Sequence, residues 1–190
     1  MSNSTVIVIA VAVVVVGFPF IYVLTQYNAL VKLRNYIRDS WADIDTELKR
    51  RYDLIPNLVS TVKAYAAHER ETLERVTELR NQCYANNGKV GDQARDEKQL
   101  VDALGKLLAI SENYPDLKAS DNFLQLQKEL VNTEDRIQAA RRFFNGNVRD
   151  YRNKCEQFPS SMVASMFGFQ PEDFFDVEPA VREAPQVSLG

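Results

Sequence analysis

The feature that most constrains the fold is a long segment, residues 26–84, which contains no glycine and a single proline, Pro56. Large apolar side chains recur along its first part at steps of three and four residues, once the position of Arg51 is counted: Leu30, Leu33, Ile37, Trp41, Ile44, Leu48, Ile55, Leu58, Val62 and Tyr65. Steps that alternate between three and four place these side chains on one face of a helix. The segment therefore predicts a long helix that packs against other helices.

Two more helices are predicted beyond a break at residues 85–92, which hold two glycines and two asparagines. The first covers residues 93–113 and the second covers residues 119–158. Their apolar stripes are Leu100, Leu104, Leu107 and Leu108 in the first, and Phe123, Leu126, Leu130, Thr133, Ile137, Ala140, Phe144, Val148, Tyr151, Cys155 and Phe158 in the second. No segment alternates as a strand does. We predict an all-α fold, an antiparallel coiled-coil-like bundle of three to four long helices over residues 26–158.

Pro56 leaves the number of helices open. Either the chain reverses there, which gives four shorter helices, or one helix continues with a kink. The stripe stays in phase from Leu48 to Val62, and this favours the kink. A continuous helix over residues 26–84 would be about 88 Å long. The other two helices are too short to cover it, so we expect neighbouring copies of the chain to cover the rest, in a homo-oligomer.

The N-terminal residues differ from the rest of the chain. The run from Val6 to Leu24 is 19 residues long and carries no charge. As a helix it would be roughly 28 Å long, which matches the apolar core of a bilayer. A cleaved signal peptide is the alternative, but the run has no basic residues before it and no small-residue cleavage site after it. We predict a retained single-pass transmembrane helix over residues 1–25, including Val6, Val16, Gly17, Pro19 and Leu24.

Charges beside this run predict its orientation. Lys32, Arg34 and Arg38 follow the run, and no basic residue precedes it. The positive-inside rule then puts the N-terminus outside and the bundle in the cytoplasm, with a periplasmic bundle as the alternative. A cytoplasmic bundle would keep Cys83 and Cys155 reduced. The net charge of −3 argues against a nucleic-acid partner.

The sequence offers little catalytic chemistry. His68 and Glu69 begin half of a zincin motif, but His68 is the only histidine, so a zinc site would lack its usual ligands. No phosphate-binding glycine loop, nucleophile elbow or Cys–His pair occurs. We predict no catalytic residue, no metal and no cofactor, and therefore no enzyme. A hydrolase with an unrecognised site is the least favoured alternative.

Some charged residues fall on or beside the apolar stripes. These are Arg51, Glu134 and Arg141. Buried polar pairs can fix register in helical bundles, at a cost in stability. We hypothesise that Glu134 pairs with Arg50 or Arg51 near Pro56, where the proline frees helix carbonyls. The predicted kink and polar network consist of Arg50, Arg51, Pro56, Asn57, Glu134 and Arg141.

Residues 159–190 predict a short amphipathic segment and a flexible tail rich in proline and acidic residues. The sequence "FGFQPEDFF" within it is apolar enough to dock on a surface. Two alternatives stay open, since it could dock back on the bundle or on a partner. The motif would use Phe167, Phe169, Phe174 and Phe175.

Several stretches resemble the LemA family in order along residues 26–169. They include "YNALVKLRNYIRDSWADIDTELKRRYDLIPNLVSTVKAYAAHE", "YPDLKASDNFLQLQKELVNTEDRIQAARRFFNGNVRDY" and "FPSSMVASMFGF". The matching positions are Trp41, Asp45, Leu54, Pro56, Asn57, Tyr65, Glu69, Leu117, Glu129, Glu134, Arg136 and Arg141. One departure is Phe144, where the family pattern usually has tyrosine.

The resemblance implies a protein of the bacterial inner membrane with an N-terminal anchor and an antiparallel helical bundle. It implies no established enzymatic activity, and it suggests a link to HtpX-type membrane metalloproteases. Together with the residues, it predicts a membrane-anchored, self-associating scaffold or adaptor. The alternative is a coat-like assembly that shapes or partitions membrane.

Overall fold

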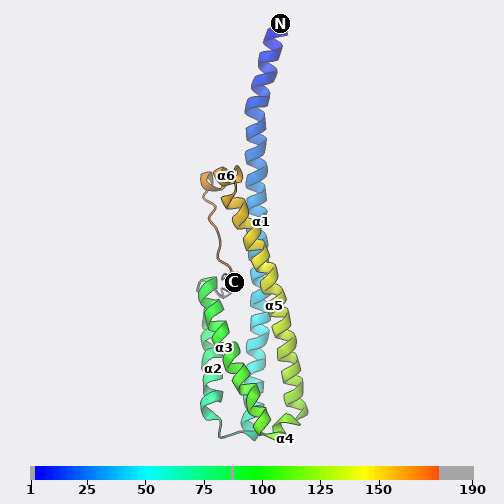
Figure 1. Cartoon of the computed structure of the whole chain (residues 1–190), viewed down its shortest axis with the longest axis vertical. Helices are drawn as coiled ribbons and strands as arrows, with labels where there is room; N and C mark the ends of the chain where they lie inside the picture. The colour runs from blue at the N-terminus through cyan, green and yellow to red at the C-terminus, as the bar shows by residue number, and fades with distance from the viewer. Residues whose placement is uncertain (1–2, 87, 176–190) are drawn as a thin grey trace, which may run out of the picture. The chain divides into compact units, whose positions relative to one another are not determined.

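The computed structural model of the chain describes residues 3–86 and 88–175, except for the side chains of residues 5–14 (Figure 1). All regular structure in these residues is helical. The long elements are α1 (Asn3–Tyr65), α2 (Arg70–Ala85), α3 (Val90–Ile110) and α5 (Asp121–Glu156). The short elements are the 3₁₀ turn η1 (Ser111–Asn113), α4 (Pro115–Lys118) and α6 (Ser160–Met166).

The chain divides into two compact units, and both α1 and α5 contribute to each of them. Unit 1 contains residues 1–40 and 146–172, and unit 2 contains residues 41–145 and 173–190. The two are described separately below.

Unit 2 is a helical bundle made of α1 from residue 41, α2, α3 and α5 up to residue 145. Each helix sends a stripe of apolar side chains into one core: Ile44, Leu48, Ile55, Leu58 and Val62 from α1, Leu73, Val76 and Leu79 from α2, Leu100, Leu104 and Leu107 from α3, and Phe123, Leu130, Ile137 and Phe144 from α5. Burying a side chain of this size stabilises the fold by about 1.5–3 kcal/mol. Three to four helices were predicted, four of them only if the chain reversed at Pro56. The described part of unit 2 contains four long helical segments.

The prediction of one helix over residues 26–84 is wrong. α1 ends at Tyr65, and the chain reverses through residues 66–69 before α2 begins at Arg70. No glycine or proline marks the reversal. Within the reversal the Glu69 amide donates to the Ala66 carbonyl at 3.2 Å, and Ala66 is buried. The reason is tertiary, because the reversal lets α2 bury Leu73 and Val76 against the other helices.

Helix α1 continues through Pro56, so the proline neither ends nor reverses it. The other boundaries lie close to their predicted places. The helix predicted over residues 93–113 is α3 followed by η1, and the helix predicted over residues 119–158 is α5. The break predicted at residues 85–92 coincides with the connection between α2 and α3.

Unit 1 packs the earlier part of α1 against the end of α5, α6 and the residues that follow. The Asn147 side-chain amide of α5 donates to the Tyr36 carbonyl and to the Ser40 hydroxyl, each at 3.2 Å. Tyr151 and Cys155 are buried on the same helix, and burial raises the pKa of each side chain. Phe169 packs its ring edge-on against Tyr27, with ring centroids 5.7 Å apart.

The N-terminal part of α1 holds the residues predicted to form the anchor. Val16 is 70% exposed and Leu24 is 47% exposed, while Gly17 and Pro19 lie within the same helix. The side chain of Val6 lies outside the described residues. Across the described part of the chain, none of the helices has both the length and the apolar character needed for a membrane span. The anchor therefore stays a prediction.

Candidate functional site

The main polar feature of unit 2 is a buried charged cluster that joins three helices. Arg51 of α1 is 3% exposed, and its guanidinium pairs with Glu97 of α3 and with Glu134 of α5. The distance from Arg51 Nη1 to Glu134 Oε2 is 2.6 Å. Tyr52 donates its phenolic proton to the other oxygen of Glu97. We call Arg51, Tyr52, Glu97 and Glu134 the polar node.

The two carboxylates of the polar node differ in their exposure to solvent. Glu97 is buried, whereas the Glu134 side chain is 34% exposed and also accepts a hydrogen bond of 2.8 Å from the Gln138 amide. The Arg51 guanidinium therefore neutralises the buried Glu97 carboxylate. The Glu134 carboxylate is stabilised in addition by solvent and by the hydrogen bond from Gln138. Buried charged groups need partners of this kind. Removing one partner leaves an unpaired buried charge, which destabilises the fold by about 3–5 kcal/mol.

Two neighbouring groups that could act as nucleophiles stay protonated at neutral pH. Burial, followed by the charge of Glu97, raises the pKa of Tyr52 well above its ordinary value of 10.0. Burial also raises the pKa of Cys83 of α2 to about 12, with smaller contributions from Glu97 and Asp96. The thiolate is the reactive form of cysteine, so Cys83 is placed as an inert thiol. The chemistry of the node is that of a structural tie.

The fourth helix of the bundle joins this region through the backbone. A proline has no N–H, so Pro56 cannot donate to the carbonyl four residues earlier, which is that of Tyr52. Arg80 of α2 supplies the missing donor, with its Nε 3.2 Å from the Tyr52 carbonyl oxygen. The Arg80 guanidinium also lies 5.0 Å from the centre of the Tyr84 ring. The proline thus creates the place where α2 attaches to α1.

A cavity of about 230 Å³ opens beside the polar node. Its walls come from α1, α3 and α5 and from Phe175: Leu48, Arg51, Ala94, Glu97, Lys98, Val101, Asp102, Glu134, Ile137, Gln138, Arg141 and Phe175. Three cationic and three acidic side chains line it, so neither sign of charge dominates. Such a lining can hold water or a polar side chain, but it does not select an ion of one sign.

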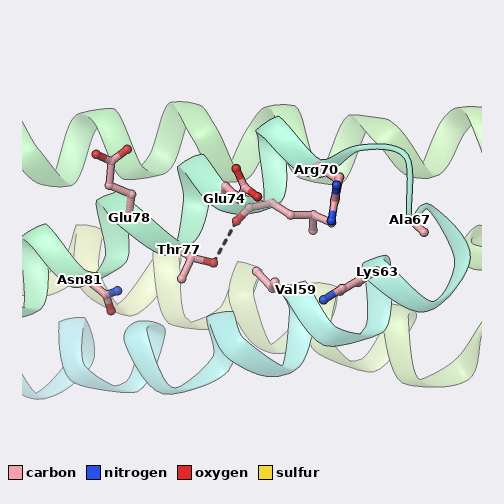
Figure 2. A pocket seen from close by; sticks show the side chains of 9 residues that line it. Val59, Lys63, Ala67, Arg70, Glu74, Thr77, Glu78 and Asn81 are labelled. Carbon is pink, nitrogen blue, oxygen red and sulfur yellow. Dashed lines mark hydrogen bonds between the residues drawn. The ribbon is translucent and has the colours of Figure 1, made fainter.

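A larger hollow, of about 540 Å³, lies between the end of α1 and α2. Figure 2 shows the cationic ends of Lys63 and Arg70 toward the end of the hollow near Ala67, with Glu74 and Glu78 further along α2. All four charged side chains are exposed. Thr77 uses its hydroxyl within its own helix, donating to the Leu73 carbonyl at 2.9 Å. The hollow is a solvated groove with balanced charges, and it converges on no reacting group.

The residues after α6 are divided between the two units, and each part is described within its own unit. Phe169 belongs to unit 1, where the Arg34 guanidinium lies 5.1 Å from its ring centre. Phe175 belongs to unit 2 and is 1% exposed, with its ring 5.6 Å from Trp41. Phe167 is 49% exposed, and Phe174 is half-buried. This motif was expected to dock either back on the bundle or on a partner. Its residues Phe169 and Phe175 are buried among side chains of this same chain. Residues 176–190 of the predicted flexible tail lie outside the described residues.

The residues predicted for a kink and polar network fall into two groups. Arg51 and Glu134 meet in the node, and Arg141 lines the cavity beside it. Arg50 points away, and its side chain is 56% exposed with Glu47 3.9 Å distant. Asn57 is exposed on α1, where its carbonyl accepts a hydrogen bond from the Thr61 hydroxyl.

Four members of the site were missed from the sequence, namely Tyr52, Glu97, Arg80 and Asn145. Glu97 could have been found, because it lies three residues before Leu100 and so extends the apolar stripe of α3. Arg80 could not have been found from the sequence. The missing N–H of Pro56 identifies the carbonyl that lacks a donor, but it does not indicate which side chain supplies the new donor. Asn145 holds the main chain of Phe175, and nothing in its local sequence indicates this.

Metal binding has no support in this part of the molecule. No group of three or more histidine, cysteine, aspartate or glutamate side chains could hold a metal ion within residues 3–86 and 88–175.

Comparisons with known proteins agree with the sequence resemblance. The magnetosome protein MamQ of Magnetospirillum gryphiswaldense is 26% identical over 183 residues, which cover 83% of this chain and 67% of that protein. Magnetosome protein MamQ 2 of Paramagnetospirillum magneticum is 24% identical over 183 residues, with the same coverage. Protein LemA of Metamycoplasma hominis is 29% identical over 170 residues, which cover 90% of this chain and 74% of that protein. The LemA family model matches residues 40–189, most of the chain, and the chain therefore belongs to the LemA family.

Proposed function

We propose that this chain is a membrane-anchored, non-enzymatic scaffold that self-associates at the bacterial inner membrane. The observation that carries the proposal is the surface of α1 between Val15 and Leu24. Six large apolar side chains there are exposed by 47–72%: Val15, Val16, Phe18, Phe20, Ile21 and Leu24. No charged residue interrupts them.

A helix that is apolar on all sides needs an apolar environment around it. Water would leave this surface uncovered, and large exposed apolar surfaces mark sites of membrane or protein contact. The uncharged run of 19 residues from Val6 to Leu24 has the length of a bilayer core. The lipid bilayer is therefore the partner that we propose for this part of α1.

The basic residues after the run support a cytoplasmic bundle. Lys32, Arg34 and Arg38 lie within the stretch that the positive-inside rule weighs, and no lysine or arginine precedes the run. Two of the relatives are named as magnetosome proteins, which supports the proposed association with a membrane. The non-enzymatic part of the proposal rests on the sequence, which offers no recognisable catalytic motif.

Self-association is supported by apolar side chains on the outside of unit 2. Leu124 and Val131 of α5 are 47% and 54% exposed. They are seven residues apart and therefore share one face of the helix. A face of this kind suits a neighbouring helix from another copy.

Anchoring and orientation are tested with single cysteine variants in cells. Ser4→Cys reports on the N-terminus, and Lys128→Cys reports on the bundle, while the two native cysteines are buried. We expect a membrane-impermeant maleimide to label Ser4→Cys in intact spheroplasts and Lys128→Cys only after permeabilisation. Labelling in the opposite order places the bundle outside. Release of the chain from membranes by high salt alone overturns the anchor.

Self-association is tested by cross-linking in intact membranes. Discrete small oligomers support a scaffold or adaptor, whereas open-ended ladders support a coat-like assembly. The paired variant Leu124→Glu and Val131→Glu tests the outer face of α5, and Asn122→Glu, exposed on another side of the same helix, is its control. A chain that stays monomeric overturns self-association. Partners, including a membrane metalloprotease, are tested by affinity capture with and without residues 159–190.

A further inference from the structure

Unit 2 contains a small site that holds one residue, Phe175, by both its ring and its backbone. The ring is 1% exposed and lies 5.6 Å from Trp41, which in turn lies 5.5 Å from Phe144. The Arg141 guanidinium lies 5.0 Å from the centre of the Phe175 ring. The Trp41 ring, itself supported by Phe144, and a cation over the ring face form a pocket for an aromatic side chain.

Asn145 recognises the backbone of the same residue. Its side-chain oxygen accepts from the Phe175 amide at 2.9 Å, and its side-chain nitrogen donates to the Phe175 carbonyl at 2.7 Å. This pair of bonds satisfies both backbone polar groups of one residue, as a neighbouring strand would. The site therefore recognises one residue by its aromatic ring and by its backbone, and these contacts need no covalent link between the site and that residue.

The connection to Phe175 is poorly held by its surroundings. Gln170, Pro171, Glu172 and Asp173 are all exposed. Gly168 before them has a φ of 70°, a conformation that glycine adopts without strain and that permits a sharp change of direction. Withdrawing Phe175 from its site would thus leave these four residues in water, as they already are, and would also move the half-buried Phe174.

We propose that the Trp41–Arg141–Phe144–Asn145 site is a peptide-binding site whose partner is residues 173–175 of a second copy of this chain. The chain's own segment already shows the fit, and an identical segment from a neighbour fits equally well. Exchange of identical elements is a low-cost route to association. The inference rests on the proposed self-association, because copies anchored in one membrane meet at high effective concentration.

The test is complementation between two defective full-length chains that carry different tags in the same membranes. Asn145→Ala damages the site and leaves the segment intact, while Phe175→Ala damages the segment and leaves the site intact. Association is measured by cross-linking followed by capture through one tag and detection of the other. Asn132→Ala and Phe143→Ala, both exposed on α5, are the matched controls.

Wild-type chains and the two controls should associate. Each defective chain should associate with itself about tenfold less, because two hydrogen bonds or the buried ring are lost. The mixture of the two defective chains should recover association, since the intact segment of one reaches the intact site of the other. Circular dichroism of each variant checks that its helices are retained, and Phe175→Leu gives a second variant that keeps apolar volume without the ring.

Three outcomes overturn the proposal, and they have different meanings. If wild-type chains associate and the mixture does not recover, the segment binds only its own chain. If both defective chains associate as the wild type does, the site is not the contact, while self-association itself stands. If wild-type chains do not associate, the proposed self-association fails together with the exchange.

Discussion

Arg80 donates from its Nε to the carbonyl oxygen of Tyr52, the acceptor that Pro56 leaves without its helical N–H. The proline lies in the middle of α1, and the donor comes from α2. A residue that usually breaks a helix here creates a main-chain acceptor for a side chain on the neighbouring helix. The bond ties the packing of α2 to a fixed position on α1.

This relationship predicts a specific coupling between Arg80 and Pro56. Arg80→Ala leaves the Tyr52 carbonyl unsatisfied, and we expect the free energy of unfolding to fall by about 1–3 kcal/mol. Pro56→Ala restores a helical N–H to the same carbonyl, so the loss from Arg80→Ala should be smaller in the Pro56→Ala background. Denaturant unfolding of the four chains of this double-mutant cycle measures the coupling.

The control for this cycle is Arg75→Ala on the same helix. Arg75 forms an exposed pair with Glu78, with the two side chains 51% and 67% exposed, so its loss should change stability by less than about 1 kcal/mol. Equal losses from Arg80→Ala with and without Pro56 would show that the carbonyl is not the source of the effect.

For the polar node, we expect that removing one partner alone lowers the free energy of unfolding more than replacing all partners together. Glu97→Leu leaves the Arg51 guanidinium with only the half-exposed Glu134, and we expect a loss of about 3–5 kcal/mol. The combined variant Arg51→Leu, Tyr52→Phe, Glu97→Leu and Glu134→Leu should recover most of that loss, because no charge then stays unpaired. Thermal and denaturant unfolding compare the two variants.

The exposed pair of Lys49 and Asp45 supplies the control for the node. Lys49→Ala should have little effect, because the side chains of Lys49 and of its partner Asp45 are both well exposed. The combined variant also tests whether the node fixes the packing of the bundle. A combined variant with an unchanged oligomeric state and unchanged helix register would show that the node has no role in specificity.

The sequence predicted the helices of this fold better than it predicted the chain reversal. Apolar residues at steps of three and four located the core faces of α1, α3 and α5, since each face must be buried along its length. The same rule failed at residues 66–69. The steps continue through the reversal, from Val62 to Ala66, Glu69, Leu73 and Val76, because both helices bury their stripes in one core. Continuity of phase therefore does not distinguish a kink from a reversal.

The candidate site was predictable only where its members interrupt a stripe. Arg51 and Glu134 stand out as charges at core positions, and the hypothesis that they pair agrees with their distance of 2.6 Å. Helical periodicity places Arg51, and not Arg50, on the face of the apolar stripe. The spacing of the stripe therefore indicates which of the two arginines can reach Glu134. The contacts of Arg80 and Asn145 depend on which helices become neighbours, and a single sequence does not contain that information.

Cys83 predicts a distinctive loss of stability at alkaline pH. Burial, followed by Glu97 and Asp96, raises the pKa of its thiol from the ordinary 9.0 to about 12 in the folded chain. Because the folded pKa is the higher one, the stability that this group contributes is fully present below pH 9 and is lost as pH rises toward 12. Cys83→Ala should therefore have a shallower fall in unfolding free energy over that range than the wild type.

Alkylation of the thiol provides an independent check on Cys83. The residue is 1% exposed, so iodoacetamide should modify it only when the bundle opens. Its modification rate at pH 8 should rise with denaturant in step with unfolding. Fast modification of the folded chain at that pH would contradict both the burial and the raised pKa.

Trp41 gives a direct optical report on the segment that ends at Phe175. It is the only tryptophan of the chain, and it packs against the Phe175 ring. Phe175→Ala removes that ring, so water reaches the indole, and we expect the Trp41 emission to shift to longer wavelength and acrylamide to quench it more strongly. The core of the bundle keeps Phe144 and its other apolar residues, so the helical content should not change. Phe167→Ala is the control, because Phe167 packs on Tyr27 in unit 1 and is 49% exposed. If Phe175→Ala leaves the emission and quenching of Trp41 as they are in the wild type, the ring does not shield Trp41 in solution, and the proposed peptide site loses its basis.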